Sequence, residues 1–467
     1  MRRRSASIVL GCTLLLVPAP TAAGFAPAPT AAEAGAVTIV AAAPPVTGSA
    51  GAGASATQVH AARTVVRTKK ANKRIKRVLR TRTRSRVLGS RFTMTVWDTA
   101  KSKYVYKKRA YSSLRGASTT KILTAVGVLA TMGPDRRMPT TVRSGASADE
   151  VVLVAGGDPL LTSADLRTLA ARTAEALGAA PAGTPSPSPS GTATAQSTRE
   201  IVVRADDSLF SSEGRSRGWR SSWVPSQVRY VRAFARDDRK VRDATADAGA
   251  YFASALRALG VSATYAGEAT ADPAATTLAG IDGHTAAEAV SHMLLVSDND
   301  TAEMLFRHIA VARGLPGTWA DARRAQADTL RELRVPLSGV RIIDGSGLST
   351  TGRVTAYSLT SALNRALSPK HPELSGLRGW LPVAGRTGTL RASYGRYNSW
   401  PARCAAGQVQ AKTGPLADAI SLAGYAAGAD GKTKIFVSIV NKRPTRYSRL
   451  TTRKYVDRAV SSLTGCW

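Results

Sequence analysis

The chain has 467 residues, of which 65 are Lys or Arg and 31 are Asp or Glu, so its formal net charge is +34. This length excludes one small domain, because ordinary domains contain roughly 100–200 residues. The charge is typical of nucleic-acid-binding proteins and of proteins that lie beside another polyanion. The five histidines form no H-E-x-x-H zinc motif, and the chain contains no G-x-x-x-x-G-K-[ST] phosphate loop. We therefore expect neither a metal nor a cofactor.

The first 23 residues have the three parts of a secretory signal. Residues 2–4 are arginines, residues 8–17 are an apolar run, and residues 21–23 are small. The apolar run is shorter than the roughly 20 residues that a membrane-spanning helix needs. A lipoprotein signal ending at Cys12 is the alternative, but it leaves almost no apolar residues before the cysteine. We expect a secreted, extracytoplasmic or cell-wall protein, and this expectation argues against a nucleic-acid partner.

Two unusual segments follow the signal. Residues 25–62 are rich in Ala, Pro, Gly, Thr and Ser, a composition typical of a flexible tether. Residues 63–91 contain many Lys and Arg and no acidic residue. This basic arm is either a solvated segment or an electrostatic tether to anionic wall polymers or to the outer leaflet. It has no aromatic residue for stacking on single-stranded nucleic acid. We expect residues 24–90 to be largely disordered.

Folded sequence is expected from residue 91. Residues 92–97 and 103–107 predict a strand hairpin, and the apolar residues 122–132 predict a helix. Ser118 and Lys121 lie at the first turn of this helix. Their spacing stacks a hydroxyl beneath an amine, which is the geometry of a serine nucleophile with a lysine base. Such a spacing alone more often marks only a solvated helix face.

Residues 136–275 have the pattern of an inserted lobe. They contain strand patterns at 151–154 and 201–204, helix patterns at 163–177 and 248–259, and a Pro/Ser/Thr-rich loop at 181–198. The main domain is expected over 91–135 and 276–467, with helices at 285–295, 301–311 and 453–463 and strands at 421–426 and 434–440. The predicted fold class is α/β (α+β), with an antiparallel sheet flanked by helices.

Two further motifs accompany Ser118 and Lys121. Ser297-Asp298-Asn299 lies between two predicted helices, and Lys412-Thr413-Gly414 stands just before the paired strands. The order S-x-x-K, S-x-N, K-T-G describes the site of penicilloyl serine transferases.

Five longer stretches narrow the match. Residues 116–124, 156–161, 297–303, 344–349 and 421–425 resemble the class C low-molecular-mass penicillin-binding proteins, which are D-alanyl-D-alanine carboxypeptidases/endopeptidases. The resemblance runs from about residue 91 to the C-terminus. It implies the penicilloyl serine transferase fold, with a large insertion between the first and second motifs. It also implies a serine enzyme that acts on the D-Ala-D-Ala stem peptides of peptidoglycan and is covalently inhibited by β-lactams.

The same resemblance gives roles to the first two motifs. Ser118 would attack the carbonyl of the penultimate D-alanine and form an acyl-enzyme, while Lys121 would take its proton. Ser297 would relay protons toward the leaving amine. Asn299 would hold the substrate's peptide amide and orient Lys121.

The third motif contains the one departure from the family's pattern. Lys412 and Thr413 would engage the terminal carboxylate, and Gly414 would leave room for the substrate. The next residue, Pro415, has no N–H, although this fold uses the amide at that position as one of two oxyanion donors. Losing one donor typically costs about 10²–10³ in turnover. Either the protein is a catalytically weak wall-binding or scaffolding homologue, or another amide, such as that of Leu416, compensates.

Removal of the signal leaves Cys404 and Cys466, which are either a disulfide that closes a loop of roughly 60 residues or two unpaired buried thiols.

The segment 386–389, Arg-Thr-Gly-Thr, looks like a second K-T-G, but no paired strands follow it. We interpret it as a loop from which Arg386 can reach a carboxylate. A β-lactamase is disfavoured by the large insertion and by the absence of a recognisable deacylating glutamate.

Overall fold

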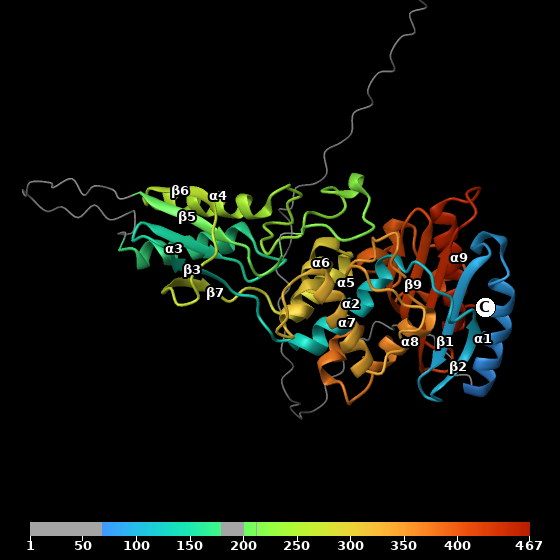
Figure 1. Ribbon diagram of the computed structural model, residues 1–467. Helices are drawn as coiled ribbons and strands as arrows, with labels where there is room; N and C mark the ends of the chain where they lie inside the picture. The colour runs from blue at the N-terminus through green and yellow to red at the C-terminus, as the bar shows by residue number, and fades with distance from the viewer. Residues whose placement is uncertain (1–67, 179–199, 212) are drawn as a thin grey trace, which may run out of the picture. The chain divides into compact units, whose positions relative to one another are not determined.

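The computed structural model describes residues 68–178, 200–211 and 213–467, and within them the chain forms two five-stranded sheets (Figure 1). The first sheet has the order β2-β1-β10-β9-β8 and is antiparallel throughout. Its strands are β1 (Arg91–Asp98), β2 (Lys103–Lys108), β8 (Val409–Pro415), β9 (Ala419–Ala427) and β10 (Thr433–Asn441). The expected signal and the whole tether lie outside the described residues. No helix in the described ranges is long and apolar enough to cross a membrane.

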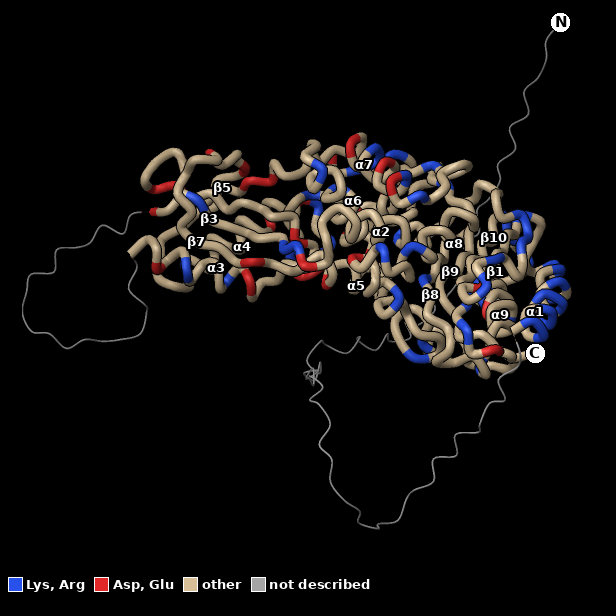
Figure 2. Tube along the Cα trace, turned by 90° about the horizontal axis from the view of Figure 1, so that it is seen from below, with Lys and Arg blue, Asp and Glu red and all other residues tan. Residues whose placement is uncertain are grey.

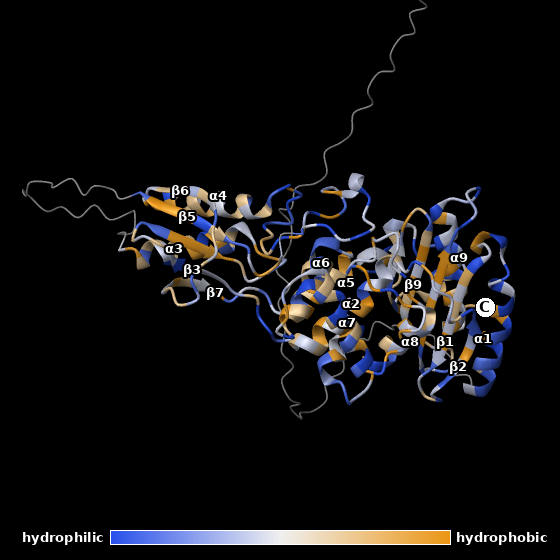
Figure 3. Cartoon of the chain, in the orientation of Figure 1, coloured by the Kyte–Doolittle hydropathy of each residue, from blue (hydrophilic) through white to orange (hydrophobic). Residues whose placement is uncertain are grey.

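Helices cover both faces of this first sheet (Figure 1). The covering helices are α2 (Lys121–Met132) and α8 (Ala356–Arg365) on one face, and α1 (Thr68–Arg82) and α9 (Arg449–Ser461) on the other. Along β10, Ile435, Val437 and Ile439 belong to the core that contains α2 and α8, whereas Phe436 and Val440 belong to the core with α1 and α9. Because both faces are buried, the strand is almost continuously apolar. Figure 3 shows this concentration of hydrophobic residues on the strands.

Three more helices pack around α2 and bring the second motif to its side. They are α5 (Ala286–Val296), α6 (Asn299–Val311) and α7 (Trp319–Glu332). A capping box between Thr285 and Glu288 begins α5, and Asp298 caps the start of α6 through the amide of Thr301. Ser297 ends α5 in the left-handed conformation, with φ of 69°. The second motif is therefore the sharp junction between two helices.

The inserted lobe contains the second sheet, which has the order β6-β5-β4-β3-β7. Its elements are β3 (Thr140–Ser144), β4 (Glu150–Val154), α3 (Ser163–Ala176), β5 (Ile201–Asp206), α4 (Ala244–Ala258), β6 (Ala263–Glu268) and β7 (Thr277–Ile281). Because β7 pairs with β3, the lobe continues to about residue 281, and the expected boundary at 275 is wrong. Strand β7 is short and mostly half-exposed, so its sequence lacks a clear strand pattern.

The basic arm is also different from its expected state. Residues 68–82 form α1, and Ala71, Ile75 and Leu79 on this helix are completely buried. Their spacing of four residues places them on one face, which packs against the first sheet. The expectation of disorder is therefore wrong for residues 68–90. Most residues of α1 are charged, so its sequence does not predict a packed helix. Ala71, Ile75 and Leu79 can be buried only because the first sheet has an apolar face on which the helix packs.

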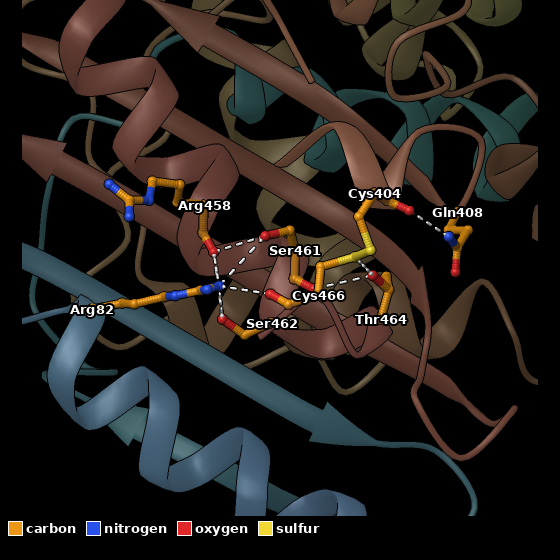
Figure 4. Close-up of a disulfide and its surroundings, with 8 residues drawn as sticks. All are labelled: Arg82, Cys404, Gln408, Arg458, Ser461, Ser462, Thr464 and Cys466. Carbon is orange, nitrogen blue, oxygen red and sulfur yellow. Dashed lines mark hydrogen bonds between the residues drawn. A yellow bond between two sulfur atoms is a disulfide. The ribbon is translucent and has the colours of Figure 1, made fainter. Parts of the chain in front are cut away.

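A disulfide and an arginine fix the end of the chain beside α1 (Figure 4). Cys404 and Cys466 are joined with their Cα atoms 5.8 Å apart and a sequence separation of 62. The Arg82 guanidinium donates to the Arg458 carbonyl at 2.6 Å, to the Ser462 hydroxyl at 2.7 Å and to the Cys466 carbonyl at 3.1 Å. These contacts connect α1, α9 and the segment before β8.

Replacing Cys404 and Cys466 together by serine is expected to lower the free energy of unfolding by about 4 kcal/mol. The disulfide joins two residues that are 62 apart in the sequence. Without this cross-link the unfolded chain has greater conformational entropy, which stabilises the unfolded state. Urea denaturation of the oxidised wild type and of the double variant measures this difference. Equal unfolding midpoints and slopes would contradict it.

Candidate active site

The first motif forms a strained turn in front of α2. Ala117–Thr120 is a short 3-10 turn, in which Ser118 is half-buried and Lys121 completely buried. The Lys121 ammonium donates to the Ser118 hydroxyl at 3.2 Å. Ala117 has a φ of +47°, and a Cβ on Gly347 would lie 2.1 Å from its carbonyl oxygen. Close packing of a glycine against this turn therefore holds the serine at the first turn of α2.

The second motif meets the first through Asn299. The Asn299 Oδ1 atom accepts from Lys121 Nζ at 2.7 Å, and its Nδ2 atom donates to the Gln227 carbonyl at 2.8 Å. Ser297 lies two residues earlier, half-buried at the junction of α5 and α6. The structure thus joins Ser118, Lys121 and Asn299 in one hydrogen-bonded chain, with Ser297 on the adjoining turn.

The third motif lies within β8, the edge strand, and the paired strands β9 and β10 follow it, as expected. A Cβ on Gly414 would lie 2.2 Å from the Ser421 Oγ atom and 2.9 Å from the Gly116 carbonyl oxygen. The glycine therefore lets β8 pass directly beside the turn that carries Ser118. Lys412 is completely buried and donates to the Thr413 carbonyl at 3.1 Å. All three motifs border the same region of the first sheet.

The loop at residues 386–389 also contributes to this region, which the sequence analysis did not anticipate. The Thr413 hydroxyl donates to the Thr389 hydroxyl at 2.8 Å. Gly388–Leu390 forms a single 3-10 turn, so the segment is a loop, as its lack of paired strands predicted. The likeness of Arg-Thr-Gly-Thr to K-T-G was the signal for Thr389. Arg386 instead lies over Gly407, before β8 begins.

Strand register determines where the missing amide of Pro415 would point. Leu416 donates its amide to the Ala419 carbonyl at 2.8 Å, and Ala411 donates to the Pro382 carbonyl at 2.9 Å, away from β9. Since amides alternate along an antiparallel strand, position 415 faces the same side as Ala411. The edge strand tolerates Pro415 for this reason. The alternative in which Leu416 compensates is wrong in this structure, because its amide is already used within the sheet.

Burial controls the charge of both lysines. It lowers the pKa of Lys121 to about 8, against the opposing effect of Glu303, Asp298, Asp344 and Asp300. Burial, followed by the nearby charge of Lys121, lowers the pKa of Lys412 well below its usual range. A neutral Lys121 amine is therefore accessible near neutral pH, 3.2 Å from the Ser118 hydroxyl.

Two buried carboxyl groups lie beneath Lys121, and the sequence analysis gave them no role. Glu303 accepts from the amides of Gly345 and Ser346, both at 2.8 Å, and Lys121 donates to the Ser346 carbonyl at 3.3 Å. Asp344 accepts from the Ser349 amide at 2.6 Å. Burial and the charge of Asp344 raise the pKa of Glu303 to about 8. The loop 344–349 thus connects Lys121 to an acidic core.

The inserted lobe supports both the loop and the second motif. Trp219 donates its indole N–H to Asp344 at 2.9 Å. The Arg229 amide donates to Asp300 at 2.6 Å, and the Lys240 ammonium also bonds to that carboxylate. Only the tertiary structure brings these lobe residues to the site, because residues 219–240 contain no motif that would mark them.

The chain is similar in sequence to a known family of carboxypeptidases. The model of the D-Ala-D-Ala carboxypeptidase 3 (S13) family matches residues 76–229 and 232–462. The chain belongs to this family. Carboxypeptidase DacB of Mycolicibacterium smegmatis is 28% identical over 78% of each chain, and carboxypeptidase Rv3627c of Mycobacterium tuberculosis is 29% identical over 70% of this chain and 71% of its own.

A solved structure supports the fold assignment independently. Penicillin-binding protein 4 (dacB) from Haemophilus influenzae superposes with a TM-score of 0.66 at 19% identity, covering 81% of this chain and 98% of its own. The predicted membership of the class C penicillin-binding proteins is confirmed, and so is the penicilloyl serine transferase fold. The protein is a serine-type D-Ala-D-Ala carboxypeptidase of this family.

Proposed function

We propose that this carboxypeptidase is exported and cleaves peptidoglycan stem peptides through an acyl-enzyme on Ser118. The observation that carries the proposal is the Lys121 ammonium, hydrogen-bonded to Ser118 at 3.2 Å and to Asn299 at 2.7 Å. A serine paired with a buried, pKa-lowered amine is an activated nucleophile. The disulfide supports export, since such bonds persist in oxidising compartments.

The reaction proceeds in two steps. Neutral Lys121 takes the hydroxyl proton as Ser118 Oγ attacks the carbonyl carbon of the penultimate D-alanine. Breakage of the C–N bond leaves an ester on Ser118, while Ser297 passes a proton to the departing amine. A water molecule then hydrolyses the ester and restores the serine. Asn299 holds the substrate amide and keeps the lysine oriented throughout.

Charge explains the preference for a free carboxylate next to the scissile bond. Lys412 is completely buried, and burial together with the nearby charge of Lys121 makes its charged form unfavourable. A substrate carboxylate that reaches Lys412 and Thr413 compensates this cost. The same contacts serve an endopeptidase, because its substrates also break after a D-alanine and differ only beyond it.

Covalent inhibition by β-lactams belongs to the same proposal. One solved structure of the Haemophilus influenzae protein is described as a complex with a novel beta-lactam, and it superposes with a TM-score of 0.62 at 19% identity. We expect a β-lactam carbonyl to occupy the position of the D-alanyl carbonyl and to acylate Ser118.

Release of D-alanine from a soluble peptide ending in D-Ala-D-Ala tests the activity. We expect release by the purified chain and its suppression after one equivalent of penicillin per chain. A cross-linked dimer of stem peptides in the same assay tests endopeptidase action. If neither peptide is cleaved and no penicillin adduct forms under any pH between 6 and 9, the proposal fails.

The pH dependence of acylation reports the pKa of Lys121. Acceptance of the serine proton requires the neutral amine, so the rate should rise with pH through about 8 and level off above it. At pH 6 we expect a rate about 100-fold below the plateau, because each unit below the pKa reduces the neutral fraction about tenfold. Stopped-flow acylation by a fluorescent penicillin measures this profile. A flat profile would exclude Lys121 as the base.

A second candidate function follows from Pro415. A chain that binds the peptide but turns over slowly would act as a wall-binding or scaffolding homologue. Measured turnover of the D-Ala-D-Ala peptide separates the two functions, since the slow homologue would bind the peptide with ordinary affinity while releasing almost no D-alanine.

A further inference from the structure

All exposed charged residues of α1 are basic. Ala71, Ile75 and Leu79 face the sheet. The charged residues of the helix are all cations, and most of them are exposed to solvent. The exposed cations on α1 are Lys69, Lys70, Lys73, Arg74, Lys76, Arg77 and Arg80. Figure 2 shows Lys and Arg along α1 with no acidic residue on the helix. Within the described chain this is a continuous face of one sign.

A basic hollow continues this face at the C-terminal end of α1. It has a volume of about 510 Å³, and its lining includes Arg84, Arg86, Lys108, Arg109 and Arg446 but no acidic residue. No ion pair to a described carboxylate is formed by any of these five side chains. Burial, Arg109 and Arg84 together lower the pKa of Lys108, which is consistent with crowded positive charge. The hollow therefore lacks counter-charges from the protein itself.

The arrangement is rigidly attached to the folded domain. Arg82 anchors the end of α1 to the C-terminal turn beside the disulfide (Figure 4). Lys108 donates to the Thr83 carbonyl at 2.6 Å, and Arg109 bonds to the Ser90 carbonyl. The cations are thus presented on a fixed surface, and not on a disordered arm as first expected. A fixed set of guanidinium groups suits phosphate, which accepts two parallel hydrogen bonds from each.

We propose that the basic face of α1 and the hollow beside it bind a phosphate-bearing anionic polymer of the cell envelope. The envelope as its source rests on the proposed function, whereas the polyanion chemistry rests on the surface alone. A membrane surface fits less well, because the apolar side of α1 is already buried and cannot insert. Nucleic acid fits less well, because α1 has no aromatic residue and Phe92 in the hollow is buried.

End-labelled linear polyphosphate serves as the probe, and fluorescence anisotropy with the full chain measures its affinity at several salt concentrations. The hollow variant carries Arg84→Gln, Arg86→Gln and Arg446→Gln, which are all exposed positions. We expect its affinity to fall about 10- to 100-fold near physiological salt. The slope of log K against log salt should decrease by about 2, since each lost phosphate contact contributes about 0.7.

A matched control removes the same amount of charge elsewhere. Arg313→Gln, Arg324→Gln and Arg331→Gln replace arginines that pair with Glu332, Asp321 and Asp328, outside the proposed surface. We expect this variant to keep the polyphosphate affinity within about threefold of wild type. D-Alanine release should be unchanged in both variants. This assay is independent of polyphosphate binding and shows that each variant is folded and that its serine site is intact.

Two results would overturn the inference. One is equal loss of affinity in the hollow and control variants, which would mean that net charge alone attracts the probe. The other is tighter binding of single-stranded DNA or of phosphatidylglycerol vesicles than of polyphosphate, which would assign the surface to nucleic acid or membrane. Because D-alanine release is measured in the same preparations, failure of this inference is distinguishable from failure of the proposed enzyme function.

Discussion

Replacing Ser118 by alanine is expected to abolish the covalent penicillin adduct and to reduce D-alanine release by about 10⁴-fold or more. The hydroxyl is the acceptor for Lys121 at 3.2 Å, and no other atom of residue 118 can form the ester. Alanine fits the turn because Ser118 is only half-buried and its neighbour Ala117 already has the required conformation. Intact-mass spectrometry after incubation with penicillin measures the adduct directly.

Ser113→Ala is the matched control for the nucleophile. Ser113 lies five residues upstream, is exposed, and donates its hydroxyl to the Gly339 carbonyl at 2.7 Å, so its loss should leave acylation unchanged. An adduct of the same mass on the Ser118→Ala chain would show that another residue is the nucleophile. Peptide mapping of the wild-type adduct would then identify that residue.

Replacing Pro415 by threonine is expected to raise D-alanine release by about 10²–10³-fold. Strand register directs the amide of position 415 away from β9, and the substitution restores an N–H there. A single oxyanion donor is typically worth this factor in turnover. The amide of Leu416 donates to Ala419 and so does not replace it. The gain should appear in kcat, with little change in KM, because the donor acts on charge that develops during the reaction.

Pro415→Ala separates the backbone effect from that of the side chain. Both alanine and threonine restore the N–H, so we expect both variants to gain activity to a similar extent. An increase with threonine alone would mean that its hydroxyl, and not the amide, causes the gain. No increase in either variant would mean that the wild-type oxyanion site is complete, and the slow-homologue function would lose its basis.

Much of the fold was predictable because its elements have strong local patterns. The strand at 92–97 and the helix at 122–132 appear as β1 and α2 with nearly the expected bounds. Helix α1 was not predicted, since its three buried apolar residues are outnumbered by cations. Strand β7 was also missed, because its stability comes from pairing with β3 and not from its own composition.

The sequence alone predicted the reacting groups. Ser118 and Lys121 have the spacing of one helical turn, and Asn299 belongs to the second motif, so all three could be named before the structure was known; their catalytic roles remain predictions. Only the tertiary structure decided what surrounds them. Glu303 and Asp344 lie in stretches that resemble the family, and Trp219 lies in no motif, but none of the three could be placed beside Lys121 or its loop from the sequence, because burial and long-range hydrogen bonds exist only after distant segments pack together. The same physical reason turned the basic arm into an ordered helix: docking depends on a sheet face that its own residues do not encode.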